Sequence, residues 1–354
     1  MKPNNCNPFL SKGDDNIHDD YQELLFQSQE EFDFVDKNCK VFGRPETLEI
    51  VYYWTKARAD KGAMVPQAVT VDASMELFSF ISIYLLVFLF KMSTALDTIT
   101  PSQSMSDGKT LISQDGSFEL GFFSAGISKN RYLGIWYKNI PVRTIVWVAN
   151  RSSPINDSSG LLMIDISGNL LILSGNKTVV WSSESSKEAQ SPILQLLDSG
   201  NLVLRDEKES DPGIYLWQSF DYPSDTLLPG MKLGVNLKTG LDRRLTSWKS
   251  WDDPSPGDFF WKIQIHNNPE STMWKGSRIF FRTGPWNGIT YSGTPQLKPN
   301  PIFYFNFVHN EDEVYYTFGL KKKSIISRLV MNQTNNRRDR YTWDEAAQSW
   351  SLYT

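Results

Sequence analysis

Three short stretches of this chain carry polar side chains at alternate positions, as a strand must if it is to bind a ligand through hydrogen bonds. Leu197-Asp-Ser-Gly-Asn-Leu-Val-Leu-Arg205 alternates apolar and polar residues, and Ile164-Asp-Ile-Ser-Gly-Asn-Leu-Leu-Ile-Leu173 repeats the pattern. A third and weaker copy is Gln114-Asp-Gly-Ser-Phe-Glu-Leu120. Because alternate residues of a strand point to the same face, the chemistry that these stretches suit is binding.

Motifs for catalysis and metal binding are missing from the sequence. It contains no Gly-x-Ser-x-Gly elbow, no phosphate-binding Gly-Lys-Thr loop and no kinase signature. Its two cysteines, Cys6 and Cys39, and its three histidines show no metal-ligand spacing. We therefore predict no catalytic residue, no metal and no cofactor. A glycan hydrolase, which needs two carboxylates brought together by the fold, stays open as an alternative.

The elements that position the three copies are strands. Each copy leads to a tryptophan, at Trp181 and Trp217 and, by a longer path, at Trp147. Repeats at roughly 30 to 35 residues predict a symmetric architecture whose units share one core. Short segments rich in β-branched and aromatic residues alternate with Asp-Gly, Ser-Gly and Gly-Asn corners between residues 97 and 222. We expect three sheets around one axis, with the tryptophans in its core rather than stacked on sugars.

Residues 223–354 are again rich in strand patterns. Phe259–Ile265 and Phe303–Val308 alternate aromatic or aliphatic residues with polar ones. Glu313–Phe318 and Ser324–Met331 flank a Gly-Leu-Lys-Lys-Lys turn, and this pattern predicts a β-hairpin. The whole body of the protein is therefore predicted to be all-β.

The N-terminal part differs from the rest of the chain. Residues 1–74 carry 13 acidic and 8 basic residues and are predicted to be poorly ordered. Residues 75–95 contain an apolar run, Leu77–Phe90, that favours a signal peptide cleaved between Ala95 and Leu96. An uncleaved membrane anchor at 77–95 is the alternative, and a buried core element is a further one. Both the cleaved signal peptide and the uncleaved anchor would place residues 96–354 outside the cytoplasm.

Charge and glycosylation motifs agree with a secreted protein. Residues 96–354 carry 26 acidic and 27 basic residues, so they offer no basic face for nucleic acid. Four N-glycosylation sequons follow the apolar run and none precedes it. If they are used, all four must lie at the surface. They begin at Asn150, Asn156, Asn176 and Asn332.

Several motifs carry a resemblance to a known family. Thr144-Ile-Val-Trp-Val-Ala-Asn-Arg151 and Trp217-Gln-Ser-Phe-Asp-Tyr-Pro-Ser-Asp-Thr-Leu-Leu-Pro-Gly-Met231 resemble the ectodomain of plant S-domain (G-type, bulb-type lectin) receptor-like serine/threonine kinases and the related S-locus glycoproteins. Leu245-Thr-Ser-Trp-Lys-Ser-Trp-Asp-Asp-Pro-Ser-Pro-Gly-Asp258 and Phe281-Arg-Thr-Gly-Pro-Trp-Asn-Gly288 resemble their second, S-locus glycoprotein-type domain. The resemblance covers residues 75–354.

The resemblance implies a bulb-lectin β-prism with three-fold pseudo-symmetry at 96–222 and a strand-rich S-locus glycoprotein-type domain at 223–354, cut before the EGF, PAN and kinase parts. Bulb-type lectins hold mannose with Gln-x-Asp-x-Asn-x-Val-x-Tyr. This chain keeps Asn201 and Val203 in one copy, Asn169 in another and Asp115 in the third. These four residues are the candidate carbohydrate-binding residues. Since no copy is complete, we expect the stretches to be retained mainly as scaffold.

The predicted function is extracellular recognition, by the ligand-binding part of such a receptor without its kinase. The resemblance implies a role in pollen recognition (self-incompatibility) or immune surveillance. The predicted partner is an extracellular peptide, protein or glycan, or a related receptor ectodomain, with no nucleic acid and with membrane contact only through 77–95. A mannose-binding defence lectin is the alternative, and a cell-wall glycan hydrolase is a less favoured one.

Overall fold

The computed structural model describes residues 97–354, apart from 186–188, 212, 267, 295–299 and 354. Within these residues the chain forms strands joined by turns, with a single 3-10 turn, η2, at Ser219–Asp221. The all-β prediction is confirmed. The predicted extension at 1–74 and the signal segment at 75–95, with its cleavage site at Ala95 and Leu96, lie outside the described residues.

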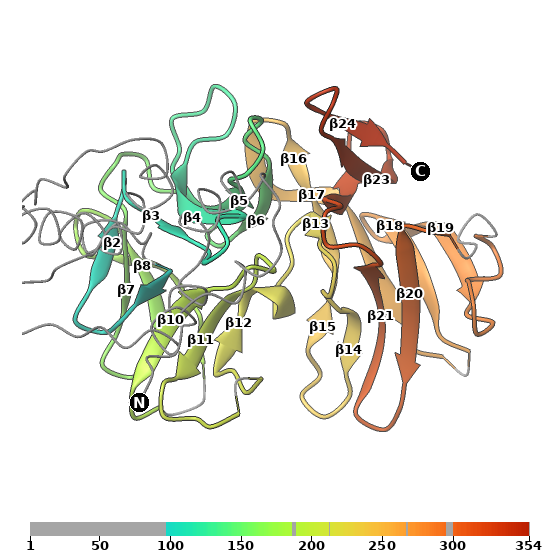
Figure 1. Ribbon diagram of the computed structural model, residues 1–354, viewed down its shortest axis with the longest axis horizontal. Coiled ribbons are helices and arrows are strands. Elements are labelled where there is room, and N and C mark those ends of the chain that lie inside the picture. The colour runs from blue at the N-terminus through green and yellow to red at the C-terminus, as the bar shows by residue number, and fades with distance from the viewer. Residues whose placement is uncertain (1–96, 186–188, 212, 267, 295–299, 354) are drawn as a thin grey trace, which may run out of the picture. The chain divides into compact units, whose positions relative to one another are not determined.

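The first twelve strands form three four-stranded antiparallel sheets, which we call the N-terminal prism (Figure 1). One sheet is made of four strands that are consecutive in the sequence: β3(Thr110–Ile112), β4(Phe118–Phe123), β5(Tyr132–Tyr137) and β6(Ile145–Val148). The next pairs β2(Ser104–Ser106) with β7(Leu161–Ile164), β8(Leu170–Leu173) and β9(Val179–Ser182). The last pairs β1(Thr98–Ile99) with β10(Pro192–Leu196), β11(Leu202–Asp206) and β12(Trp217–Gln218). Each sheet is therefore nested inside the next along the chain.

The turn that begins each repeated stretch explains why the repeat contains glycine. Gly116, Gly168 and Gly200 have φ angles of 77°, 80° and 81°, a left-handed conformation that a side chain disfavours. At Gly200 a Cβ atom would also lie only 2.8 Å from the Phe118 ring. The repeat thus preserves the geometry of the hairpin corner.

A tryptophan from each sheet lies at the centre of the N-terminal prism. The rings of Trp147 and Trp217 are 5.9 Å apart, those of Trp181 and Trp217 are 5.7 Å apart, and those of Trp147 and Trp181 are 6.4 Å apart. All three pairs meet edge to face, with interplanar angles of 66° to 81°. Edge-to-face packing is the favoured contact between aromatic rings. The prediction of a tryptophan core is confirmed.

The next twelve strands form three further four-stranded sheets, the C-terminal prism, with a similar nesting. Here too one sheet takes four consecutive strands, β16(Leu245–Ser250), β17(Asp253–Gln264), β18(Glu270–Lys275) and β19(Arg278–Pro285). A second takes β14(Leu233–Asn236), β15(Asp242–Arg243), β20(Phe303–His309) and β21(Glu313–Leu320). The third pairs β13(Thr226–Leu227) with β22(Ser327–Asn332), β23(Arg337–Asp344) and β24(Ser349–Leu352). The strand patterns of residues 223–354 thus build a second prism-like unit.

One predicted contact in this unit is wrong. β21 and β22 were expected to pair as a hairpin, but β21 pairs with β14 and β20, while β22 pairs with β13 and β23. Both edges of each strand are therefore occupied, and the lysine-rich connection crosses from one sheet to another. Alternation along a segment predicts that it forms a strand, but it does not predict which other strands pair with its two edges.

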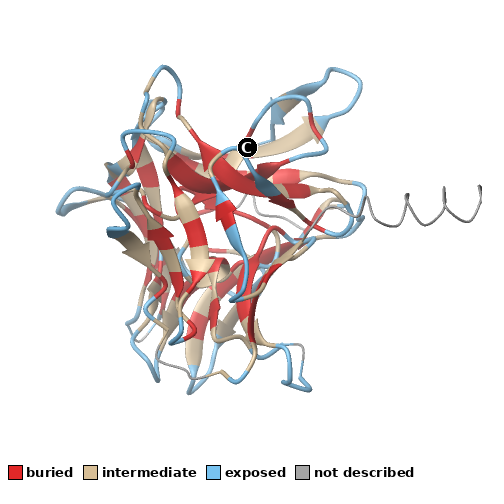
Figure 2. Cartoon of the chain, turned by 90° about the vertical axis from the view of Figure 1, so that its left-hand side faces the viewer, coloured by how far each residue is buried: buried red, intermediate tan, exposed pale blue. Residues whose placement is uncertain are grey.

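The two prisms share one hydrophobic core. Alternation of buried and less buried residues runs along strands of both prisms, as in β8 and β22. Figure 2 shows buried and less buried stretches alternating along strands of the chain. Buried residues from every sheet belong to a single cluster, which contains Leu120, Leu204, Leu245 and Phe318 among others. Such alternation lets each sheet pack one face inward and leave the other open.

Candidate functional site

Asn201, the best candidate sugar ligand, lies at the corner between β10 and β11 and is only 5% exposed. Its Oδ1 accepts hydrogen bonds from Ser219 Oγ and Phe220 N, both at 3.2 Å. Its Nδ2 donates to Gln218 Oε1 at 2.9 Å. Because both ends of the amide are engaged within the protein, Asn201 fastens its own strand to the segment that follows β12.

Val203, two residues further along β11, is completely buried. It lies in the middle of its sheet, paired with Gln195 on one side and with Gln218 on the other. A side chain without exposed surface packs against protein atoms and has none left for a sugar ring.

Asn169 repeats the arrangement of Asn201 in the sheet of β7, β8 and β9. Its Oδ1 accepts a hydrogen bond from Ser185 N at 2.8 Å. Next to it, Ser183 Oγ accepts from Leu170 N at 3.0 Å, just as Ser219 Oγ accepts from Leu202 N at 2.9 Å. In both copies, the serine two residues after the central tryptophan ties the loop back to the repeated strand.

Asp115 differs from the other candidates because it is exposed. Its Oδ1 accepts from Ser113 Oγ at 3.0 Å and from Ser117 N at 2.8 Å, and its Oδ2 accepts from Ser117 Oγ at 2.8 Å. Partial burial acts to raise the pKa of Asp115, but the hydrogen bonds from Ser117 and Ser113 outweigh it and lower the pKa. The carboxylate thus stabilises its own turn.

The four candidate residues do not form one site. Asp115, Asn169 and Asn201 belong to the corners of three different sheets, and only Asn201 and Val203 share a strand segment. Their polar groups make local hydrogen bonds that hold corners and loops in place. A sugar would have to displace these bonds before it could bind.

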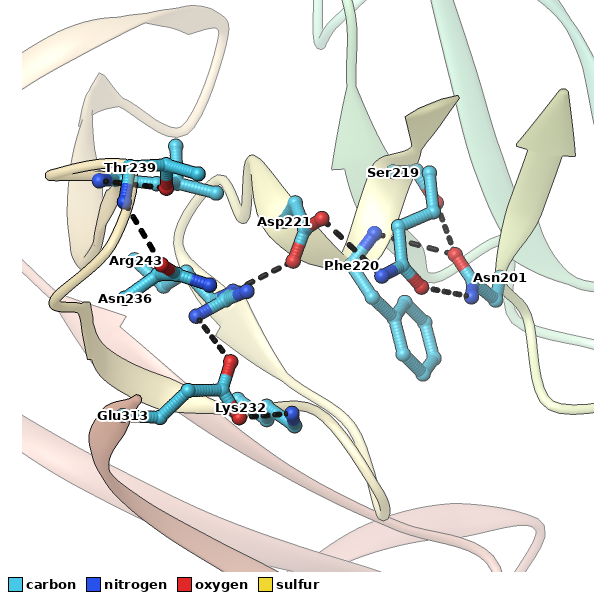
Figure 3. Close-up of polar contacts among 11 residues, drawn as sticks. Asn201, Ser219, Phe220, Asp221, Lys232, Asn236, Thr239, Arg243 and Glu313 are labelled. Carbon is cyan, nitrogen blue, oxygen red and sulfur yellow. Dashed lines mark hydrogen bonds and ion pairs between the residues drawn. The ribbon is translucent and has the colours of Figure 1, made fainter. Parts of the chain in front are cut away.

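Asn201 begins a polar network that crosses from one prism to the other (Figure 3). Gln218 Nε2 donates to Asp221 Oδ2 at 3.1 Å, and Arg243 Nε donates to Asp221 Oδ1 at 2.5 Å. Arg243 Nη1 also lies 3.3 Å from Glu313 Oε1. This arginine is only 5% exposed, so its two carboxylate partners compensate a charge that would be costly to bury alone.

Arg151 forms a second connection between the prisms. Its Nε donates to Pro254 O at 2.6 Å, and its Nη2 donates to Ser247 O at 2.7 Å and Thr246 O at 3.1 Å. Burial lowers the pKa of Arg151, while the nearby carboxylate of Asp225 acts to raise it. Sequence reasoning found neither Arg151 nor Arg243, since the carbonyl partners of Arg151 and the Glu313 partner of Arg243 lie far away along the chain.

Further contacts join the same two surfaces. Trp147 Nε1 donates to Tyr222 O at 2.8 Å, Tyr137 Oη to Ser327 O at 3.3 Å, and Trp350 Nε1 to Thr144 Oγ1 at 2.9 Å. A central tryptophan of the N-terminal prism therefore also holds the junction.

The four sequon asparagines occupy different environments. Asn156 and Asn176 are exposed and Asn332 is partly exposed, but Asn150 is only 1% exposed. Asn150 Nδ2, the atom that would carry a glycan, donates to Ser153 O at 2.9 Å and Arg131 O at 3.3 Å. Its Oδ1 accepts from Leu133 N at 2.8 Å. Asn150 therefore does not meet the condition that a used sequon lies at the surface, while glycosylation at the four asparagines stays a prediction.

The described residues contain neither a membrane-spanning helix nor a metal-binding cluster. Among the described residues, no helix is long and apolar enough to cross a membrane. Over the same residues, no group of three or more histidine, cysteine, aspartate or glutamate side chains is placed to hold a metal ion.

Three nested sheets around a tryptophan triad, with an asparagine or aspartate at each corner, define a bulb-type lectin prism, here followed by a second β unit. Residues 144–249 match the model of the D-mannose binding lectin domain, and residues 281–354 match that of the S-locus glycoprotein domain. The lectin match continues past β12, so the domain limits of 96–222 and 223–354 stay predictions.

The relatives of the chain agree with these two domains. It is 44% identical over 280 residues to receptor-like serine/threonine-protein kinase SD1-8 of Arabidopsis thaliana, covering 78% of this chain and 33% of the kinase. It is 44% identical over 281 residues to S-locus-specific glycoprotein S6 of Brassica oleracea, covering 78% of this chain and 64% of that protein. The chain therefore belongs to the family of S-locus glycoproteins and G-type lectin S-receptor-like kinases.

Part of the chain is similar to a solved lectin structure. The mannose-specific agglutinin from snowdrop (Galanthus nivalis) bulbs, complexed with methyl-α-D-mannoside, is 18% identical and covers 33% of this chain and 95% of that one. The TM-score is 0.24, which is too low to carry any argument.

Proposed function

We propose that this chain is an extracellular recognition module, the ligand-binding part of an S-domain receptor. Its relatives include an S-locus-specific glycoprotein, and its residues 281–354 match the S-locus glycoprotein domain. The chain spans about a third of the kinase relative, so signalling output is not included in the proposal.

The observation that carries this proposal is the state of the three repeated corners. Asn201 is 5% exposed with both ends of its amide hydrogen-bonded within the protein, and Val203 has no exposed surface. Binding of a ligand there would break hydrogen bonds that hold the prism and its junction together. Recognition is therefore assigned to other surfaces of the two joined prisms, with a peptide, a protein or a glycan as the extracellular ligand.

A glycan array and calorimetry with mannose and mannan test the proposal on the full chain. We expect no binding of mannose that depends on the corner residues. Strong mannose binding that is lost in both the Asn169→Ala and Asn201→Ala variants would overturn it. The matched control is Asn139→Ala, an exposed asparagine outside the corners and outside the four sequons. Circular dichroism must show that the variants are folded, because Asn201 also stabilises the structure.

A mannose-binding lectin is the second candidate, because the family model for residues 144–249 describes such a domain. The glycan array distinguishes the two candidates by whether mannose binding depends on Asn169 and Asn201. Release of reducing sugar from cell-wall polymers would instead support the hydrolase.

Secretion through residues 75–95 is part of the same proposal. N-terminal sequencing of the protein recovered outside the cell is expected to find a mature start at Leu96. Recovery of Met1 would contradict cleavage and leave the anchor as the alternative.

A further inference from the structure

Two of the four sequons lie on neighbouring turns of the N-terminal prism. Asn156 belongs to the segment between β6 and β7, and Asn176 belongs to the turn between β8 and β9. Gly175 N donates to Ser159 Oγ at 2.7 Å, so the two turns are in contact. A Cβ atom on Gly175 would lie 2.9 Å from the Cβ atom of Ser159, which shows how closely the turns approach each other.

The side chains of Asn156 and Asn176 are available for modification. Both residues are exposed, and so are Ser158 and Thr178, the hydroxyl residues of their sequons. The turn of Asn156 is held by its neighbour Asp157, whose Oδ1 accepts from Ser159 N at 3.0 Å. Among the described residues, no hydrogen bond that holds either turn uses the amide of the sequon asparagine.

Asn150, in the sequon that precedes Asn156, is in the opposite situation. Attachment of a glycan replaces one of the two hydrogens on Nδ2 with a bulky group. At Asn150 both hydrogens are used, toward Ser153 O and Arg131 O, and the residue is only 1% exposed. A chain modified there would have to bury the sugar and break a buried hydrogen bond, so it would not reach this fold.

The two exposed sequons also lie beside an unprotected strand edge. β9 pairs with β8 on one side, and none of the described strands pairs with its other side. Val179, which begins β9 directly after the second sequon, is 52% exposed. A free edge with apolar residues favours pairing with another chain unless a charge or a covering group prevents it. β9 contains no charged residue, so a covering group is what this edge requires.

We infer that the secreted protein carries N-linked glycans at Asn156 and Asn176, that this pair of glycans covers the β9 edge, and that Asn150 stays unmodified. In the reaction, Nδ2 of each asparagine forms a bond to the anomeric carbon of a lipid-linked oligosaccharide pyrophosphate. The bond from that carbon to the pyrophosphate oxygen breaks, and the lipid pyrophosphate and the amide proton are released. Because glycans are bulky and hydrated, two of them on touching turns keep other chains away from β9. The inference rests on the proposed function, since the glycan donor is met in the secretory pathway.

Peptide mapping of the full chain recovered outside plant cells tests the sites. Enzymatic deglycosylation in heavy-oxygen water converts each modified asparagine to a labelled aspartate, and trypsin then separates the sequons. Residues 144–151 contain Asn150, whereas residues 152–177 contain both Asn156 and Asn176. We expect two labels on the peptide 152–177 and none on the peptide 144–151. Fewer than two labels on the first peptide, or any label on the second, would overturn the inference.

Each sequon can be removed while its asparagine is kept. Ser158→Ala and Thr178→Ala should each remove one glycan from the secreted protein, which gel electrophoresis detects as a faster band. The matched control Ser152→Ala removes the sequon of Asn150 and should leave the mobility unchanged. All three hydroxyl residues are exposed, so these variants should fold. A faster band for Ser152→Ala contradicts the assignment.

Coverage of the β9 edge is tested by self-association. The double variant Ser158→Ala with Thr178→Ala should form roughly fivefold more aggregate than the wild type in light scattering, because the edge is then open. Adding Val179→Lys to this variant should reverse the effect, since a charge on the edge also opposes pairing. Val142→Lys, at an exposed valine outside β9, is the matched control and should not reverse it. Wild-type scattering from the double variant, or equal rescue by the two lysines, would overturn the shielding.

Failure of this inference can be distinguished from failure of the proposed function. N-terminal sequencing of the same sample reports secretion, so a mature start at Leu96 with an unlabelled peptide 152–177 overturns the inference alone. Mannose binding that depends on Asn169 and Asn201 overturns the proposed function instead, and it leaves the two glycans in place.

Discussion

The interiors of the two prisms have a similar strand nesting but are filled with different chemistry. In the N-terminal prism, one tryptophan from each sheet meets the other two edge to face. In the C-terminal prism, Arg340 is 2% exposed and its Cζ lies 4.1 Å from the ring centroid of Phe318 and 4.7 Å from that of Phe303. Arg338 lies 4.3 Å from the ring centroid of Trp261 in the same way.

The difference shows that strand order does not dictate what fills a core. Three similar corners bring three similar tryptophans together, so one residue type repeated at one position completes the N-terminal centre. The C-terminal prism instead replaces the hydration of its arginines with aromatic ring faces. Burial lowers the pKa of Arg340, and it lowers the pKa of Arg338 to about 10. A charge held in this way is tolerated, but it adds little to stability.

The largest expected effect comes from breaking the tryptophan triad. Trp217→Ala removes a ring that contacts both partners, and it should lower the free energy of unfolding by about 3–5 kcal/mol. Urea denaturation followed by far-UV circular dichroism measures the change. Trp251→Ala, in a residue that is 68% exposed, is the control and should cost less than about 0.5 kcal/mol. Equal effects of the two changes would contradict a triad core.

The junction between the prisms should give the next largest effect. Arg151→Ala leaves three carbonyls of β16 and β17 without their charged donor, and we expect a loss of about 3 kcal/mol. Arg151→Lys should recover less than half of it, because an ammonium group does not reproduce the planar fork of the guanidinium. Arg278→Ala, in an exposed arginine of β19, is the control. The idea fails if the Arg151 and Arg278 variants unfold at the same urea concentration.

A smaller, pH-dependent effect is expected at Tyr137. Burial raises its pKa, so above pH ~10 the unfolded chain loses this proton while the folded protein keeps it. The stability from this group is therefore complete below pH ~10 and is lost as the pH rises further. Tyr137→Phe should cost about 1 kcal/mol at neutral pH and flatten the alkaline decline.

Melting temperatures measured from pH 8 to pH 11 check the Tyr137 prediction. Tyr304→Phe, in a residue that is 54% exposed, is the control and should leave the stability at neutral pH unchanged. Tyr291 and Tyr316, whose pKa values burial also raises, should keep part of the decline in every variant. An unaltered alkaline slope in Tyr137→Phe would contradict the assignment.

The smallest effect is expected inside the C-terminal prism. Arg340→Met keeps most of the side-chain volume and removes a buried charge, so stability should change by less than about 1 kcal/mol or rise. Arg340→Ala, which leaves a cavity, should instead cost about 2 kcal/mol. Urea midpoints separate the two variants. A loss in Arg340→Met as large as that in Trp217→Ala would show that the two interiors depend on their centres equally.

Local patterns predicted much of the fold. Alternation located the strands, and the Gly-Asn corners with their following tryptophans predicted three sheets around one axis. The family resemblance was recognisable from short motifs such as the one that ends in Arg151. The sequence also indicated that the mannose motif was incomplete, since the residues that replace its members can be read directly.

Contacts between distant segments were not predictable in this way. Asn150 satisfies the sequon pattern, yet the surrounding strands bury it and engage its amide. The expected hairpin of β21 and β22 failed because other strands take their edges. Arg244 and Lys262 come to lie over the rings of Phe260 and Trp274 only through the register of β16, β17 and β18.

The sequence by itself determined the strands, the left-handed glycine corners and the three tryptophans, because each depends on local conformation or on a period along one segment. The tertiary structure alone decided that the corner asparagines serve the fold, that Arg151 and Arg243 join the prisms, and that cations lie over the rings of Phe260 and Trp274. Those properties depend on which distant strands become neighbours and on which groups lose water, and neither is encoded within a single segment.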